Sequence, residues 1–379
     1  MTFGVLTLIV ASGLAGPLLS GATRLAVPVV VGEIAAGVVI GRTGFGEIDT
    51  NDPTIVFLAD AGFAMLMFVV GTRLPLRDPG LRRALRGAAV ATMLSFAIAV
   101  PVGWLLADVT AIKHPALFAL LLAAASSAVV MPILHERGLT GPGMLLAIAW
   151  IALVDIATIV ALPLALEPSR ALRIAIGGIV VTAAAVGIFL VLRAIRRHPV
   201  VRRLRHDSRD REWALDLRLS LLALFGLSAL ATWFGTSVLI AGFAAGMVIA
   251  LAGEPRRLAQ QLLGIAEGFF VPFFFVSLGA RLNFRSLASS RAEILLALVL
   301  VVAIVVCHVA IAVVMRMPWP AGLLASAQLG LPAGVVALGL TEGLLTPGQG
   351  AAIVASAVVT LGVSSIGAAM LHERLASNT

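Results

Sequence analysis

A single carboxylate lies in the middle of a long apolar stretch. Asp155 is close to the centre of residues 144–166 (MLLAIAWIALVDIATIVALPLAL) and is the only ionisable residue among them. A charged side chain near the bilayer midplane costs roughly 2.5–3.5 kcal/mol on insertion scales. Protonation removes the charge, so a carboxyl group in this position is suited to carrying a proton. Asp155 is therefore the first candidate for a proton- and cation-binding site, and proton-coupled transport is the first hypothesis.

Two other apolar segments each place a proline among small and polar residues. Pro132 lies in residues 124–138 (AASSAVVMPILHERG) and Pro332 in residues 327–339 (AQLGLPAGVVALG). Proline removes a backbone N–H group and kinks or opens a helix. The freed carbonyl groups are tolerated in a membrane where they line a cavity. Three nearby side chains are candidate oxygen ligands for a small cation, together with such carbonyls: Ser126, Ser127 and Gln328. An ordinary proline kink, satisfied by neighbouring helices, is the alternative.

Three more polar residues within apolar segments are accessory candidates. Glu33 lies deep in its segment and Asp60 lies nearer the end of another, while His308 is of the residue type that titrates near neutral pH. Each also has a structural interpretation, as a buried group that supports helix packing. The small residues of GEIAAG (32–37) and AGFAAG (241–246) predict close contacts between helices.

The composition is that of a polytopic membrane protein. The chain has 379 residues, of which 60% are hydrophobic and 12% charged, and apolar runs long enough to cross a bilayer as helices recur throughout. Its mean hydropathy is +1.08. The net charge of +8 is mostly arginine in a few loops, which argues against a nucleic-acid-binding surface. Cys307 is the sole cysteine, which excludes a disulfide framework within the chain. We expect one transmembrane domain over residues 1–379 and no soluble regulatory domain.

The apolar pattern predicts an all-α fold with about thirteen transmembrane helices. Their approximate limits are 3–20, 25–41, 54–72, 86–107, 114–134, 142–166, 171–195, 214–233, 235–252, 264–281, 293–315, 319–341 and 348–371.

Loop charge orients these spans. With the N-terminus outside, nineteen of the 27 Lys and Arg residues are on the inner side, seven are outside and Arg218 is within a span. The positive-inside rule therefore favours an outer N-terminus and a cytoplasmic C-terminus in the inner (plasma) membrane. Topology is the simplest reason for the arginines, although the loop around residues 193–211 could also contact anionic lipid headgroups.

Thirteen spans divide into two sets of six around one. The first set, residues 3–166, starts outside, whereas the second, residues 214–371, starts inside, with residues 171–195 as a linker helix. This is the arrangement of two inverted repeats, in which binding sites lie near the midplane at interrupted helices in corresponding positions. Pro132 and Pro332 occupy the fifth and twelfth spans, which predicts two broken, crossing helices beside Asp155.

These segments resemble those of the monovalent cation:proton antiporters, in the branch that contains the Kef-type and Nap-type exchangers. The resemblance covers nearly the whole chain. Its motifs are VPVVVGEIAAGVVIGRTG (27–44), LADAGFAMLMFVVGTRL (58–74), ASSAVVMPILHERG (125–138), ALVDIATIVALP (152–163), IAGFAAGMVIA and FFVPFFFVSLGARLNF. Asp60 is in the first acidic position of the second motif, Ser127 replaces a threonine in the third, and the fourth resembles the helix that carries the ion-binding aspartate.

The resemblance implies a homodimer, with a dimerisation part and a mobile core that exposes the aspartate to each side in turn. The chain departs from the family at two places. Val154 stands where electrogenic relatives have a second aspartate and electroneutral ones Asn or Gln, and Cys307 or His308 stands where many relatives have a lysine. With one carboxylate, we expect electroneutral exchange of one Na⁺ or K⁺ for one H⁺, with no cofactor and no metal other than the transported cation.

Other functions remain as alternatives. An organic-anion or other solute carrier on a similar fold is weakened because the broken helices themselves, in the spans 114–134 and 319–341, lack a Lys or Arg residue. A non-transporting membrane regulator is consistent with the missing polar partners of Asp155. An intramembrane hydrolase would need a second aspartate in a Gly-x-Gly-Asp context or a His-Glu-x-x-His motif, and neither occurs. We therefore expect a transporter and not an enzyme.

Overall fold

The described residues fold into a succession of helices. The computed structural model describes residues 1–22, 29–73, 79–136, 139, 144–166, 168–195, 198–211, 213–236, 238–252 and 256–376. Over these residues the elements are helices without a strand, which confirms the all-α prediction. Backbone contacts group the helices into two units.

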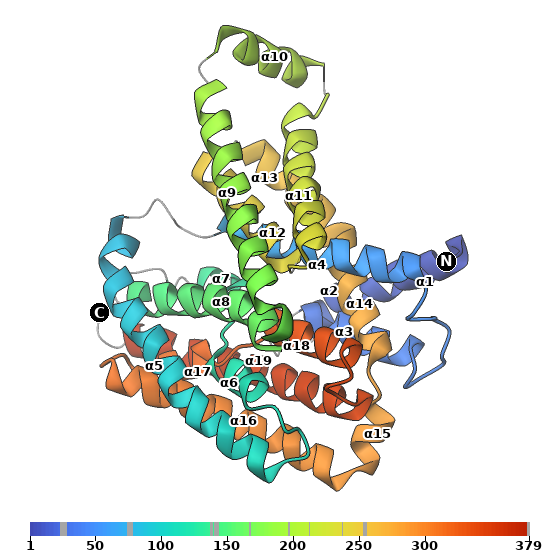
Figure 1. The fold of residues 1–379 in the computed structure, drawn as a ribbon, viewed down its shortest axis with the longest axis vertical. Coiled ribbons are helices and arrows are strands. Elements are labelled where there is room, and N and C mark those ends of the chain that lie inside the picture. The colour runs from blue at the N-terminus through green and yellow to red at the C-terminus, as the bar shows by residue number, and fades with distance from the viewer. Residues whose placement is uncertain are drawn as a thin grey trace. The chain divides into compact units, whose positions relative to one another are not determined.

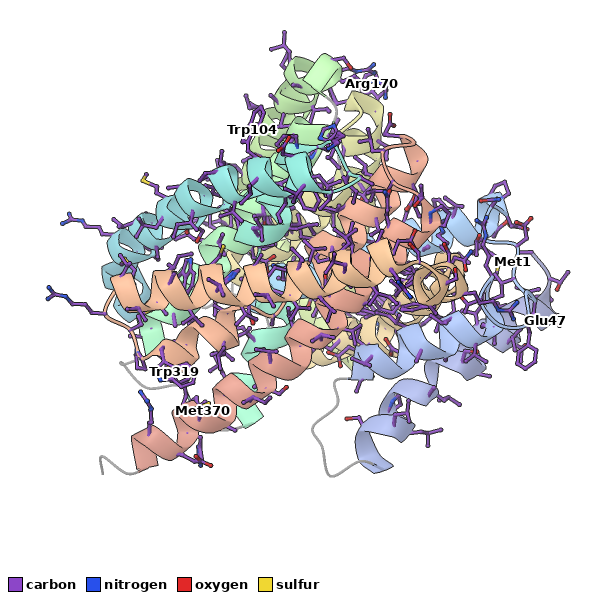
Figure 2. All side chains as sticks on the ribbon, turned by 90° about the horizontal axis from the view of Figure 1, so that it is seen from below. Met1, Glu47, Trp104, Arg170, Trp319 and Met370 are labelled. Atoms are coloured by element: carbon purple, nitrogen blue, oxygen red, sulfur yellow. The ribbon has the colours of Figure 1, made fainter. Side chains whose placement is uncertain are left out.

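The first unit comprises Met1–Thr50, Asp78–Leu166 and Phe275–Thr379. Its helices are α1 (Phe3–Gly13), α2 (Ala15–Ala22), α3 (Val29–Ile40), α5 (Pro79–Val109), α6 (Pro115–Ala123), α7 (Ser127–Glu136), α8 (Leu145–Leu166), α15 (Phe284–Ser289), α16 (Arg291–Val314), α17 (Trp319–Ala325), α18 (Gly330–Thr341) and α19 (Pro347–Ala376). Within it, α5 packs along α6 and α8, and α16 packs along α17 and α19 (Figure 1). Trp319, which is labelled in Figure 2, begins α17, and its ring centroid lies 5.7 Å from the guanidinium carbon of Arg374 on α19.

The second unit comprises Asn51–Arg77 and Glu167–Phe274. Its helices are α4 (Pro53–Arg73), α9 (Ala171–Ile195), α10 (Pro199–Asp210), α11 (Leu215–Phe234), α12 (Val238–Ala252) and α13 (Arg256–Ile265), with a 3₁₀ turn at Pro168–Arg170 and a π-helical turn at Ala266–Phe270. Helix α14 (Val271–Arg281) begins in this unit and ends in the first. Here α4 packs on α12, and α9 and α11 pack side by side (Figure 1).

Each of the thirteen predicted ranges overlaps one or more helical elements. In the described part of the chain, nine helices are long and apolar enough to cross a membrane, and α17 with α18, bent by 41°, is a tenth candidate. The ranges 25–41 and 235–252 hold shorter apolar helices, and the range 114–134 holds α6 and α7. Residues 25–28, 142–143 and 237, at or near the starts of three predicted spans, lie outside the described residues. The thirteen crossings and the division into two repeats stay predictions.

Three helices lie wholly or mostly where the sequence predicted only loops: α10, α13 and α15. Helix α10 begins at Pro199, in the arginine-rich connection after α9, where a proline at the first helical position is already fixed near the helical φ. Helix α15 is six residues long and starts after Asn283, whose side chain accepts a hydrogen bond from the Ser286 N–H at 3.0 Å. All three were missed because membrane-span periodicity does not report on short, polar or capped helices.

Glycines bring helix backbones into direct contact. On α12, a Cβ at Gly242 would meet the carbonyl oxygen of Ala64, and one at Gly246 would meet that of Phe68, both on α4. In the first unit, Gly37 of α3 faces the backbone of Val276 in the same way. The close contacts predicted from AGFAAG and GEIAAG are therefore confirmed, and they leave no room for a side chain at these crossings.

This packing predicts a strong effect of a single methyl group. Gly246→Ala forces a Cβ against the α4 backbone, so we expect it to destabilise the protein by about 1–3 kcal/mol, as overpacking does. Thermal unfolding of the purified protein in detergent measures the change. Gly226→Ala on α11 is the matched control, because a Cβ there meets nothing within 4 Å. Equal melting temperatures for the two variants would contradict the contact.

Candidate functional site

Asp155 is buried on α8, as its position in the sequence predicts. Its side chain is 5% exposed, and its Oδ2 atom accepts a hydrogen bond of 2.8 Å from the backbone N–H of Ser127. Thr158, one turn further along α8, donates its hydroxyl to the Val154 and Asp155 carbonyls of its own helix. The carboxylate thus reaches away from α8 to a backbone group of another helix.

That backbone group belongs to the first interrupted helix. Helix α6 ends at Ala123, Ala124 is extended (φ −66°, ψ 141°), and α7 begins at Ser127. The first N–H groups of a helix have no partner within the helix and carry a partial positive charge. The start of α7 is therefore an electrostatically favourable place for a carboxylate. Asp155 and Ser127 come together because the helix is broken at this point.

The second interrupted helix supplies Gln328. Helix α17 ends at Ala325 and α18 begins at Gly330, so Gln328 lies in the break, where it is 1% exposed. Its Nε2 atom donates to the carbonyl oxygens of Leu121 and Ala124, the latter at 2.9 Å. These carbonyls are at the C-terminal end of α6 and lack partners within that helix. Gln328 therefore caps the first interrupted helix from the second.

A third polar residue satisfies the end of α17. The Ser364 hydroxyl on α19 donates to the Leu324 carbonyl at 2.9 Å, and Ser364 is fully buried. Sequence reasoning missed Ser364, although it is a polar residue within the last apolar span. In both broken helices, the carbonyls at the end of the first half (α6 or α17) thus accept hydrogen bonds from side chains elsewhere in the same unit.

Two oxygens at the breaks are buried without a hydrogen-bond partner among the described residues. They are Oγ of Ser127 and Oε1 of Gln328. Ser126 is also buried, and its carbonyl accepts the N–H of Val130 at 3.1 Å, at the start of α7. Carboxylate, hydroxyl and amide oxygens are hard ligands of the kind that small cations of low polarisability prefer. The structure brings Asp155, Ser126, Ser127 and Gln328 to one pair of breaks.

The prolines lie beside the breaks and not in them. The first break, residues 124–126, precedes Pro132 by six residues, and Pro132 is inside α7. The second break, residues 326–329, precedes Pro332, which lies in the first turn of α18. A missing N–H is harmless in the first turn because that group would have no partner within the helix. The small residues before each proline therefore mark the interruptions more closely than the prolines do.

The three accessory candidates have different surroundings. Glu33 is 3% exposed on α3 in the first unit, and its Oε2 atom has no hydrogen-bond partner among the described residues. Asp60 is on α4 in the second unit, where it is exposed. His308 is fully buried on α16, and its backbone lies against Gly322 of α17.

His308 belongs to a small polar group that the sequence did not reveal. Its Nδ1 atom is 2.8 Å from the Ile304 carbonyl and therefore carries the hydrogen. Its ring centroid is 5.7 Å from that of Trp150 on α8, and the Trp150 indole donates to the Ser95 hydroxyl of α5 at 3.0 Å. This group ties α8 to α5 and places α16 beside it. The sequence did contain a signal: Ser95, Trp150 and His308 each bring a polar group into a predicted apolar span.

Comparison with known proteins shows which family the chain resembles. The chain matches the family described as "Sodium/hydrogen exchanger, transmembrane" over residues 8–373. It is 24% identical over 310 residues to the putative Na⁺/H⁺ antiporter YjbQ of Bacillus subtilis, covering 76% of this chain and 49% of that protein. It is 26% identical over 302 residues to the glutathione-regulated potassium-efflux protein KefC of an Enterobacter strain, covering 76% and 46%. The chain thus spans about half the length of these relatives.

A solved structure has a similar fold. The sodium/proton antiporter MjNhaP1 of Methanocaldococcus jannaschii superposes with a TM-score of 0.65 at 16% identity, covering 96% of this chain and 95% of that one. The likeness supports a polytopic helical membrane fold. Because the family match covers nearly all of the chain, the protein belongs to the transmembrane sodium/hydrogen exchanger family.

Proposed function

We propose that the chain exchanges a monovalent cation, Na⁺ or K⁺, for H⁺ by alternating access around Asp155. The observation that carries the proposal is the buried Asp155 carboxylate, held by the Ser127 N–H beside unpartnered oxygens of Ser127 and Gln328. Relatives named as Na⁺/H⁺ antiporters and potassium-efflux proteins support this substrate class.

A single carboxylate supports a simple exchange cycle. In its charged form, Asp155 is stabilised by the start of α7 and attracts a cation, which the hydroxyl and amide oxygens help to bind. In its neutral form, it carries one proton and needs no counter-charge. Because one site holds either one proton or one monovalent cation, each full cycle moves no net charge. Val154, an apolar residue, adds no second carboxylate.

The proposal also includes the predicted repeats, membrane orientation and oligomeric state. Two inverted repeats, residues 3–166 and 214–371 around the linker 171–195, would give the site its two access routes. The N-terminus would lie outside and the C-terminus in the cytoplasm of the plasma membrane, and the functional unit would be a homodimer. The family consists of transporters and not enzymes, which supports assigning a transport role.

Loss of the carboxylate should abolish exchange. Asp155→Asn keeps the shape and removes the charge that binds the cation, so cation addition should no longer dequench a ΔpH dye in inverted vesicles. Na⁺, K⁺ and Li⁺ are tested in turn, and Asp108→Asn, at an exposed position on α5, is the matched control and should behave as wild type. A wild type that is silent with all three cations would favour the regulator or organic-solute alternatives. An active Asp155→Asn would place the site elsewhere.

Competition at one site predicts a defined pH dependence. Below the pH at which the site is half-protonated, protons occupy Asp155, so the apparent KM for the cation should rise about tenfold per pH unit of acidification, with an unchanged maximal rate. Initial rates in proteoliposomes at several pH values measure both quantities. Exchange should also proceed without current when an ionophore clamps the membrane potential. A fall in maximal rate with constant KM, or a net current, would contradict one-for-one competition.

The cap from Gln328 also predicts an effect on stability, which is measured without a transport assay. Gln328→Met removes both hydrogen bonds to α6 and leaves buried carbonyls without partners, which should cost about 1–3 kcal/mol for each group left unsatisfied. Thermal unfolding in detergent measures the loss. Gln261→Met, on α13 outside both breaks, is the matched control and should change the melting temperature little. A Gln328→Met protein as stable as wild type would show that the cap is dispensable.

A further inference from the structure

Helix α10 connects the ends of two membrane-spanning helices. Helices α9 and α11 are candidate spans of 25 and 20 residues that pack side by side within the second unit. Helix α10 follows the end of α9 and precedes the start of α11, and it lies across both of them (Figure 1). A short segment that joins two adjacent spans must lie at a membrane surface. Its orientation across the spans directs it along the plane of that surface.

The segment around α10 is strongly basic. Residues 193–211 contain eight arginines and only two acidic residues, Asp207 and Asp210. The Arg203 and Arg211 side chains are exposed. Arginine presents planar, bidentate donors that match phosphate groups, and clusters of basic residues next to a span are attracted to anionic lipid surfaces.

Apolar side chains are exposed on the same segment. Val200 is 62% exposed and Leu204 is 43% exposed, and their spacing of four residues puts them on one face of the helix. Trp213, just beyond the end of α10, is 42% exposed, and the Arg211 guanidinium carbon lies 5.4 Å from its ring centroid. Tryptophan is enriched at membrane interfaces, where one part of the ring is apolar and another polar.

The end of α10 is fixed to α11. Ser208 is buried, its hydroxyl accepts the Leu215 N–H at 3.1 Å and its carbonyl accepts the Trp213 N–H at 3.0 Å. These bonds set the position of the helix at the start of α11. An attached helix with arginines, an exposed Val/Leu pair and an adjacent Trp has the features of an interfacial amphipathic helix.

We infer that α10 is an interfacial helix that binds anionic phospholipid headgroups. Val200, Leu204 and Trp213 enter the apolar edge of the headgroup region, while Arg203 and Arg211 contact lipid phosphates. This function is independent of cation exchange at Asp155 and adds a lipid-binding surface to the second unit.

A single fluorophore tests the inference. Cys307 is the sole cysteine, so Cys307→Ala with Val200→Cys allows one environment-sensitive label on α10. The full chain is placed in nanodiscs of phosphatidylcholine alone or of phosphatidylcholine mixed with phosphatidylglycerol. We expect the emission to shift to the blue and quenching by spin-labelled lipid to increase in the anionic discs, and high salt to reduce both changes. Identical emission in the two compositions would overturn the inference.

Two further experiments distinguish lipid binding by the α10 arginines from a general effect of the protein's charge and from binding of a small anion. Arg203→Gln with Arg211→Gln should weaken the response to phosphatidylglycerol, whereas Arg42→Gln with Arg291→Gln, which removes equal charge from the first unit, should leave it intact. Inorganic phosphate added to phosphatidylcholine discs should have no effect, and a response to it would assign a small-anion site instead. Size-exclusion profiles verify that each variant is folded. The salt dependence needs no arginine variant, so it decides the matter if the double variant does not fold.

Discussion

The candidate site depends on the requirement that every backbone polar group inside a membrane has a partner. Interrupting a helix exposes carbonyls at one end and N–H groups at the other, and lipid chains cannot form hydrogen bonds with them. The Asp155 carboxylate accepts a hydrogen bond from the N–H group at the start of α7. The Gln328 amide donates hydrogen bonds to the carbonyls at the end of α6. The carboxylate that would bind the transported ions is therefore also a structural partner of the broken helix.

These hydrogen bonds at the breaks form only if the surrounding helices are held in position. At the crossings of α12 with α4 and of α3 with α14, backbone atoms meet directly because glycine leaves no side chain between them. Trp150 adds a polar link from α8 to α5 in the first unit. Apolar packing in a bilayer is not driven by exclusion from water, so close van der Waals contact and buried hydrogen bonds must supply the specificity.

Much of this arrangement could be predicted from the sequence, because membrane spans are long and a buried charge is conspicuous. The helix ranges, the burial of Asp155 and the close contacts of AGFAAG all follow from composition and spacing. The exact position of each break did not, because Pro132 and Pro332 are the visible signal, whereas small residues before them permit the interruption. The partners of Gln328 and Ser364 could not be predicted either, since Ala124 is 204 residues from Gln328 and Leu324 is 40 residues from Ser364. Pairings over such distances require the fold itself.

The cap on α6 has a consequence for the order in which the protein is completed. Asp155 follows its partner Ser127 by 28 residues, so that bond can form soon after both are synthesised. Gln328 follows Ala124 by 204 residues, so this bond cannot form until the chain has been synthesised well into its second half. Until most of the second half has been synthesised, the carbonyls at the end of α6 therefore need a temporary hydrogen-bond partner, such as water or groups of the translocon. The first interrupted helix is begun early and finished late.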